Sequence, residues 1–182
     1  MILIIDTCAD RLHSLEFVKP VEDILKKSNC RFFTRHYSKV SQKDRSKAEK
    51  FIICGTSLKD NEFMKHADEF SWLSAEKKPV LGICAGMQII GKVFGGVLKK
   101  ATEIGLYKES FSEFLGLGSE EQVYHLHNYY IDFLKIREFD LYSRGKIPQA
   151  VKHKSREIYG VLFHPEVRQK KLIENFAGNA GK

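Results

Sequence analysis

The chain has 182 residues, of which 43% are hydrophobic, and a formal net charge of +7 from 30 basic and 23 acidic side chains. This length and apolar content indicate one domain that buries a core without disulfides or metal ions, and they exclude an intrinsically disordered chain. No apolar run is long enough to span a bilayer. Residues 1–5 are apolar but lack a preceding basic segment and a following small-residue cleavage site. We therefore expect no signal peptide and a cytoplasmic location.

The charges and the cysteines are both dispersed along the chain. The basic residues occur in short groups, with no long basic run interleaved with aromatic residues. This distribution is typical of a solvated surface and predicts binding to neither nucleic acid nor membrane, although a basic face could meet an acidic protein partner. The four cysteines are Cys8, Cys30, Cys54 and Cys84, and no two have the close spacing of a zinc knuckle or a redox pair. Each is therefore expected to be a small buried residue unless its surroundings activate it.

Up to about residue 95, apolar runs typical of buried strands alternate with segments whose apolar residues recur at helical spacing. The predicted strands cover residues 1–6, 30–37, 50–56 and 78–84. The predicted helices cover residues 15–27, 62–74 and 87–94, the last of them ended by Gly95 and Gly96. Strands that alternate with helices are the signature of a parallel sheet with helices on both faces.

The pattern changes after residue 95, where short alternating runs are separated by turn residues. These runs cover residues 95–100, 103–111, 121–130, 147–154 and 158–164. They predict antiparallel strands and hairpins attached to the same sheet, and a helix over residues 168–178 closes the chain. We therefore expect a single α/β domain over residues 1–182, with an open, mostly parallel sheet, helices on both faces and C-terminal antiparallel strands.

Cys84 has the surroundings of a nucleophile. The apolar strand that ends at Ile83 runs directly into it, and a helix follows. Gly82 and Gly86 stand two positions before and two after, which leaves room for the strained turn of a nucleophile elbow. Such a turn projects the sulfur from the carboxyl edge of the sheet, where the N-terminus of the following helix stabilises a thiolate. The alternative is a buried cysteine in a tight turn.

His164 and Glu166 supply what such a thiol needs. His164 also follows an apolar run, and Pro165 directs the chain out of the strand. Glu166 then stands where its carboxylate could reach the imidazole, as a base and its orienting group require. A histidine and a glutamate two positions apart are common in surface turns. The pair indicates an active site only in combination with Cys84.

Together these segments resemble the class I glutamine amidotransferases, whose signatures are G-x-C-x-G-x-Q and G-V-x-F-H-P-E. They stand here as GICAGMQ (residues 82–88) and GVLFHPE (residues 160–166), in the family's order. The resemblance implies a flavodoxin-like fold and hydrolysis of the glutamine side-chain amide through a thioester on Cys84. It implies that His164 takes the proton of the Cys84 thiol and gives it to the leaving ammonia, and that Glu166 holds the His164 ring in orientation. It also places the backbone N–H of Ala85 in the oxyanion hole and Gln88 at the amino-acid end of the substrate.

Two segments depart from the family pattern. The second oxyanion donor of the family comes from a Gly-Gly-Pro turn after the third strand, and here Gly55 is followed by Thr56 and Ser57. A β-branched residue resists the positive φ that glycine could adopt, so this hole is expected to be misaligned until a partner binds, or built differently. Residues 124–130 occupy the place of a W-x-S-H-x-D-like stretch whose backbone holds substrate. By that resemblance Asn128 and Tyr129 are candidate substrate contacts, although Tyr129 replaces the acidic residue.

We expect no cofactor and no metal site. The remaining histidines are predicted to lie at the surface or in hydrogen bonds, because no ligand spacing unites them. They include His36, His66, His125 and His127, of which His127 matches the histidine of the family stretch.

Three functions are consistent with these residues. The first is a glutaminase subunit that binds glutamine and passes ammonia to a separate, ATP-dependent synthetase in a hetero-oligomer, since 182 residues could not also house that synthetase. The length and Glu103-Ile104-Gly105 most resemble the amidotransferase subunit of two-subunit GMP synthases, with anthranilate- and aminodeoxychorismate-type subunits as rivals. The second is a stand-alone γ-glutamyl hydrolase of the same fold. The third is a non-catalytic regulatory module, which retention of all three catalytic residue types disfavours.

Overall fold

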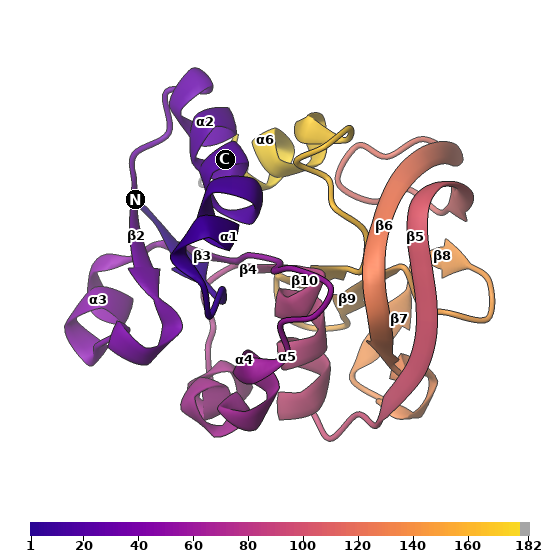
Figure 1. Cartoon of the computed structure of the whole chain (residues 1–182), viewed down its shortest axis with the longest axis horizontal. Coiled ribbons are helices and arrows are strands. Elements are labelled where there is room, and N and C mark those ends of the chain that lie inside the picture. Colours follow the sequence, from indigo (N-terminus) through magenta and orange to yellow (C-terminus); the bar gives the residue numbers. More distant parts are fainter. Residues whose placement is uncertain (179–182) are drawn as a thin grey trace.

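A computed structural model describes residues 1–178 and contains two β-sheets (Figure 1). The main sheet has seven strands in the order β2-β1-β3-β4-β10-β9-β7. The strands are β1 (Ile2–Asp6), β2 (Phe32–His36), β3 (Lys50–Ile53), β4 (Val80–Ile83), β7 (Phe139–Leu141), β9 (Ala150–His153) and β10 (Ile158–Val161). Strands β1 to β4 and β10 run parallel, which corrects the antiparallel orientation expected for residues 158–164, and β9 and β7 add an antiparallel edge. The predicted α/β class with a mostly parallel sheet is therefore confirmed.

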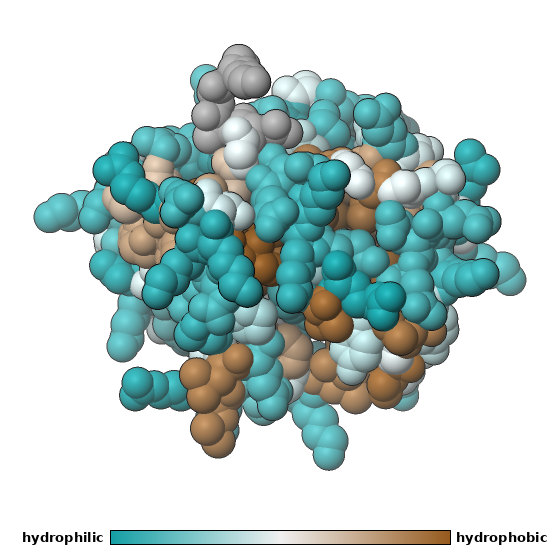
Figure 2. Space-filling view, turned by 90° about the horizontal axis from the view of Figure 1, so that it is seen from above, coloured by the Kyte–Doolittle hydropathy of each residue, from teal (hydrophilic) through white to brown (hydrophobic). Residues whose placement is uncertain are grey.

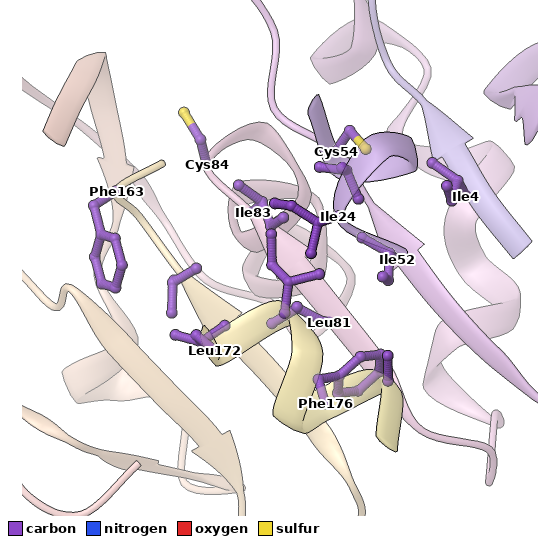
Figure 3. Close-up of a cluster of buried hydrophobic side chains, with 14 of the residues drawn as sticks. Ile4, Ile24, Ile52, Cys54, Leu81, Ile83, Cys84, Phe163, Leu172 and Phe176 are labelled. Carbon is purple, nitrogen blue, oxygen red and sulfur yellow. The ribbon is translucent and has the colours of Figure 1, made fainter. Parts of the chain in front are cut away.

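Helices cover both faces of this sheet because its central strands are apolar on both sides. In β1, Ile2 and Ile4 join one buried cluster, whereas Leu3 and Ile5 join the other. Helices α1 (Arg11–Phe17), α2 (Lys19–Lys27) and α6 (Lys170–Gly178) lie over the first cluster, part of which is drawn in Figure 3. On the opposite face lie α4 (Glu62–Lys65), a 3-10 helix (Ala67–Ser74) and α5 (Ala85–Val93). A short helix, α3 (Gln42–Lys47), follows β2.

Two predicted helices are interrupted. The helix expected over residues 15–27 is two helices, α1 and α2, which meet at Val18. Pro20 lies in the first turn of α2, and because it lacks an N–H it cannot continue the hydrogen-bond ladder of α1. The helix expected over residues 62–74 is one turn of α4 followed by the 3-10 helix.

A second sheet corrects the prediction that all the C-terminal strands join the main one. It contains β5 (Leu98–Phe111), β6 (Glu120–Ile131) and β8 (Ser143–Arg144) in the order β6-β5-β8. The runs predicted separately at 95–100 and 103–111 fall largely in the single long strand β5, whose register against β6 shifts between Lys100 and Glu103. The two long strands satisfy each other's backbone groups, so the hairpin needs no place in the main sheet.

The hairpin lies beside the carboxyl ends of β4 and β10 and is tied to them by hydrogen bonds. The backbone N–H of His164 donates to the Tyr124 carbonyl of β6 at 2.9 Å. Strands that are far apart in the sequence thus meet at one edge. This edge is where open α/β sheets bind ligands.

The face seen in Figure 2 is covered mostly by hydrophilic side chains, with hydrophobic ones exposed between them. Within residues 1–178, no helix has the length and apolar content needed to cross a bilayer.

Candidate active site

Cys84 occupies the turn between β4 and α5 in a backbone conformation that few residues adopt, with φ 47° and ψ −101°. The two flanking glycines make this turn possible. A β-carbon at Gly82 would lie 2.6 Å from the backbone of Gly86, and one at Gly86 would lie 2.2 Å from the carbonyl oxygen of Ile53 in β3. Figure 3 shows the sulfur at the border of the buried cluster, directed away from Ile83 and Leu81. The sequence therefore folds here as the predicted elbow, with the thiol next to the N-terminus of α5.

His164 and Glu166 lie in the segment after β10, the parallel neighbour of β4. The imidazole Nδ1 is 2.7 Å from Oε1 of Glu166, and both side chains are almost fully buried. The ring of Phe17 in α1 packs against the imidazole, with 5.3 Å between ring centroids. The ring position is therefore fixed by an ion-pair partner on one side and an aromatic contact on another.

The imidazole and the thiol meet around Gly55, at the end of β3. A β-carbon at Gly55 would lie 2.7 Å from Cε1 of His164 and 3.3 Å from Cβ of Cys84. Any larger residue at position 55 would therefore push the two catalytic candidates out of place. Nε2 of His164 is buried and has no hydrogen-bond partner, so this nitrogen can exchange a proton with a group in the site.

The pKa of His164 is raised well above its ordinary value. Burial by itself lowers this pKa, but the negative charges of Glu166 and of the Cys84 thiolate outweigh it. An imidazole held in this way keeps the proton that it takes from the thiol. His164 is therefore suited to accept and hold a proton beside the Cys84 thiol.

A small pocket beside Cys84 opens to solvent. Its lining includes six of the nine residues that the sequence singled out, namely Thr56, Cys84, Ala85, Gln88, Asn128 and Tyr129. Gly55, His164 and Glu166 lie behind the thiol instead of in the pocket wall. The lining mixes apolar residues such as Phe63 and Leu126 with polar side chains such as Gln88 and Asn128, which could orient a small ligand.

Thr56 does not adopt the positive φ that a glycine at this position could take. In the described chain, residues other than glycine with positive φ are Asn29, Cys84 and Leu115, so Thr56 keeps an ordinary backbone. Its hydroxyl donates to Oδ2 of Asp60 at 2.7 Å. The same carboxylate oxygen accepts the N–H of Ala9 at 2.7 Å. The turn after β3 is therefore built differently from a glycine turn, with Asp60 as its anchor.

The residues expected at the amino-acid end of the substrate hold one another in place. Nε2 of Gln88 donates to the Tyr129 carbonyl at 2.8 Å, which ties α5 to β6. Asn128 donates to the Leu58 carbonyl at 3.2 Å and accepts from the hydroxyl of Thr102 at 3.0 Å. These contacts fix the strand backbone that forms one wall of the pocket.

Sequence reasoning missed several residues of the pocket, and Asp60 and Leu126 are the two whose contacts bear most on the site. Asp60 carries three hydrogen bonds in the turn, including one from the N–H of Glu62 at 3.2 Å. Leu126 presents its carbonyl oxygen 3.8 Å from the sulfur of Cys84. A sequence signal for Asp60 existed in the turn-forming series Lys59-Asp60-Asn61, whereas Leu126 contributes only backbone and could not be found from its side chain.

The histidines fall into two groups. His36 is hydrogen-bonded to Ser38 at 2.8 Å and His66 is exposed beside Glu69, as predicted. His125 and His127 are buried on β6, and His127 lies 2.9 Å from Glu103 of β5. His125 is buried and has no hydrogen bond, which contradicts the prediction that it lies at the surface or is hydrogen-bonded. The sequence did not show how β6 pairs with β5, and so it could not show that His125 is covered.

The Glu103 carboxylate has a lowered pKa. Its burial would raise this pKa, but hydrogen bonds from His127 and Gln149 and the nearby imidazoles lower it by more. Glu103 is therefore ionised beside two buried imidazoles.

Comparison with known proteins identifies relatives over most of the chain. A sequence model of the family described as "Glutamine amidotransferase class-I" matches residues 17–179. One subunit of a glutamine-hydrolyzing GMP synthase from Methanococcus maripaludis strain C7 is 35% identical over 117 residues, which are 57% of this chain and 60% of that protein. The glutamine-hydrolyzing GMP synthase of Spiroplasma kunkelii is 34% identical over 116 residues, covering 57% of this chain and 22% of that protein.

Solved structures show the same fold. A Thermoplasma acidophilum protein described as a GMP synthase subunit superimposes with a TM-score of 0.85 at 24% identity, over 98% of this chain and 92% of that one. A glutamine amidotransferase of Thermotoga maritima gives a TM-score of 0.69 at 18% identity, over 96% and 80% of the two chains. The match to the sequence relatives spans at most about 60% of their length, whereas the fold is shared almost throughout.

Proposed function

Because the chain belongs to the class-I glutamine amidotransferase family, we propose that it hydrolyses the side-chain amide of glutamine to glutamate and ammonia. The observation that carries the proposal is the meeting of a strained elbow cysteine with a buried, carboxylate-bound imidazole around Gly55. The family match covers both motifs, and this geometry supports assigning Cys84, His164 and Glu166 as the three groups that the reaction needs.

In the proposed mechanism, the Cys84 thiol first gives its proton to His164. The thiolate sulfur then attacks the amide carbon, and the C–N bond breaks as His164 returns the proton to the departing ammonia. Water next attacks the thioester carbon with His164 as base, which releases glutamate and restores the thiol. The raised pKa of His164 suits its role as the proton carrier in both steps.

The negative oxygen of the tetrahedral intermediates needs two donors. The backbone N–H of Ala85 follows Cys84 at the N-terminus of α5, where the helix leaves its first N–H groups unpaired. Thr56 lines the same pocket as Ala85, and we assign the second N–H to the turn that contains it. Gln88, Asn128 and Tyr129 are assigned to the wall that holds the amino-acid end of glutamine.

We further infer that the ammonia passes to a separate ATP-dependent synthetase, and that the pair acts as a two-subunit GMP synthase in purine biosynthesis. The relative in Methanococcus maripaludis is named as one subunit of a GMP synthase, which supports this assignment.

The test is glutamate release from glutamine by the purified chain, alone and with the synthetase component of a GMP synthase and its nucleotide substrates. The intact protein should release glutamate, and Cys84→Ala should abolish this release. Cys30→Ala is the matched control, because Cys30 is only partly buried and its thiol donates to the carbonyl of Ser28, which is not one of the proposed site residues. Glutamate release that persists in Cys84→Ala would disprove the assignment.

A further inference from the structure

The inner face of the β5–β6 hairpin carries a second group of chemically capable side chains. His125 and His127 stand two positions apart on β6 and so share one face of the strand. Glu103 is paired directly with His127 across the hairpin, on the same face. The two histidines are buried, with 0% and 2% of their surface exposed.

Most of the ring nitrogens of these two histidines form no hydrogen bond. Of their four ring nitrogens, both in His125 and Nδ1 in His127 are buried without a partner. A neutral imidazole has one N–H donor and one lone pair, and burying either of them without a partner destabilises the folded protein. The cluster therefore contains ring nitrogens that could bind a ligand and that have no hydrogen-bond partner in the protein.

The spacing of these atoms suits one small cation. Oε2 of Glu103 lies 2.9 Å from Nε2 of His127 and 3.5 Å from Nδ1 of His125. One ligand atom from each of the three residues lies within 4.8 Å of the others. Ligands at about 2.0–2.1 Å from a tetrahedral zinc ion are about 3.3 Å apart, which falls within the observed range.

The surroundings provide the outer contacts that metal ligands usually have. Nε2 of Gln149 donates to Oε2 of Glu103 at 2.7 Å and orients the carboxylate. Oε1 of Glu109 lies 3.4 Å from Nε2 of His125, the nitrogen on the side away from Glu103. A histidine that binds metal through one nitrogen commonly donates the other N–H to such a carboxylate.

We propose that Glu103, His125 and His127 form a binding site for a divalent transition-metal ion of the zinc class. A ligand set of two imidazoles and one carboxylate leaves a fourth position for water, and imidazole ligands favour zinc over magnesium or calcium. The ion would pin β5 to β6 next to the wall of the pocket, since His127 lines that pocket together with Cys84. This site is separate from the triad and does not depend on the proposed function.

Zinc binding to the whole chain tests the proposal, with Cys84→Ala as the background so that the active-site thiolate cannot bind the metal. We expect this variant to retain one zinc ion per chain after dialysis and to unfold at a higher temperature with Zn²⁺ than without it. Glu103→Gln and His127→Gln, each added to that background, should weaken zinc binding at least tenfold and remove the thermal shift. Both replacements keep a polar side chain of similar reach, and circular dichroism of the metal-free variants checks that they fold.

Two further measurements separate this site from other zinc ligands. His66→Asn changes an exposed histidine outside the cluster and should leave zinc binding unchanged. Cobalt(II) bound to the Cys84→Ala protein should give the visible bands of nitrogen and oxygen coordination without a thiolate charge-transfer band. Zinc binding that survives both Glu103→Gln and His127→Gln, or that is lost in Cys84→Ala alone, would overturn the proposal.

Discussion

At the scale of single residues, the proton on His164 links structure to reactivity. Burial lowers the pKa of this imidazole, and the Glu166 carboxylate 2.7 Å away helps to raise it. Glu166 therefore does two things, because it holds the ring through Nδ1 and keeps the ring charged. A substitution that removes the charge but keeps the hydrogen-bond acceptor separates these roles.

We predict that His164→Ala lowers glutamine turnover about 100- to 10,000-fold, the usual range for loss of a general acid–base. Glu166→Gln should cost less, because the amide oxygen can still accept from Nδ1. Loss of the negative charge lets burial dominate, so the pKa of His164 falls and the alkaline limb of the pH–rate profile moves to lower pH. Steady-state turnover measured across pH checks both effects.

An unchanged alkaline limb in Glu166→Gln would mean that Glu166 acts only by orienting the ring. Near-full activity in His164→Ala would remove the triad from the mechanism. The thiol and the imidazole titrate together, so the alkaline limb gives an apparent pKa of the pair. The whole pH–rate profiles of the original and variant proteins are therefore compared, and no pKa is assigned to a single residue.

The four cysteines should differ in reactivity toward a glutamine-mimicking electrophile. Burial raises the pKa of Cys8 to about 12 and that of Cys54 well above its ordinary value, so both remain thiols at neutral pH. Cys84 lies in the pocket and should be labelled first. Peptide mass spectrometry after partial labelling measures the order, and free glutamine should protect Cys84 alone. Equal labelling of all four would contradict it.

The residues of the proposed triad could be picked out from the sequence because each lies in a short segment whose local pattern indicates a catalytic role. Cys84 is marked by its flanking glycines, and His164 and Glu166 are two positions apart. The grouping of Glu103 with His125 depends on pairing between β5 and β6, with a register shift that the sequence does not show. Asp60 likewise gains its role from the distant N–H of Ala9.

At the scale of elements, the elbow depends on how closely α5 approaches β3. The β-carbon of an alanine at position 86 would meet the backbone and side chain of Ile53, at 2.2 Å from the carbonyl oxygen and 2.9 Å from Cβ. These atoms cannot turn aside as a flexible side chain would. The helix must therefore shift, and Cys84 at its start must shift with it.

We predict that Gly86→Ala destabilises the protein by about 1–3 kcal/mol, the usual cost of overpacking, and lowers glutamine turnover by a larger factor than this loss of stability explains. Thermal unfolding and turnover of the folded fraction measure the two effects. Lys92→Ala is the control, since Lys92 lies on the same helix but is exposed. A Gly86→Ala protein with native activity would show that the elbow tolerates a displaced helix.

The helices and strands could be predicted where the apolar residues of a segment keep one regular spacing throughout. The pattern predicts strands β1 to β4 and helix α5 because their apolar runs are short and bounded by turn residues. The hairpin was harder, because alternation in β5 and β6 reveals a two-faced strand without saying which strand pairs with it. The break at Val18 was missed because the apolar residues of α1 and α2 continue at helical spacing on either side of it.

At the scale of the whole molecule, the oxyanion turn suggests how activity is controlled. Thr56 stands where the family has a glycine, keeps an ordinary backbone and is fastened to Asp60. A turn anchored in this way presents one donor poorly, and the loss of one oxyanion donor typically lowers turnover about 100-fold or more. A free glutaminase would also waste glutamine when no acceptor is bound.

We therefore predict that the isolated chain hydrolyses glutamine slowly and that a synthetase partner with its nucleotide substrates raises the rate. A partner docked over the mouth of the Cys84 pocket could reset the turn at residues 54–57, and a few kcal/mol of differential binding is enough to shift such an equilibrium. The measurement is glutamine turnover with and without the partner. Fast turnover that no partner changes would contradict the prediction and favour a stand-alone hydrolase.

Thr56→Gly tests the same mechanism from within the chain. Glycine admits the positive φ that threonine resists, and its lack of a hydroxyl frees the turn from Asp60. The variant should therefore have a higher basal turnover and a smaller response to the partner. Thr56→Ser is the matched control, because serine keeps the hydroxyl and lacks the freedom of glycine, so its basal turnover should stay low. If Thr56→Gly and Thr56→Ser respond alike, the backbone freedom at position 56 does not set the rate, and control of the reaction must lie in another part of the site.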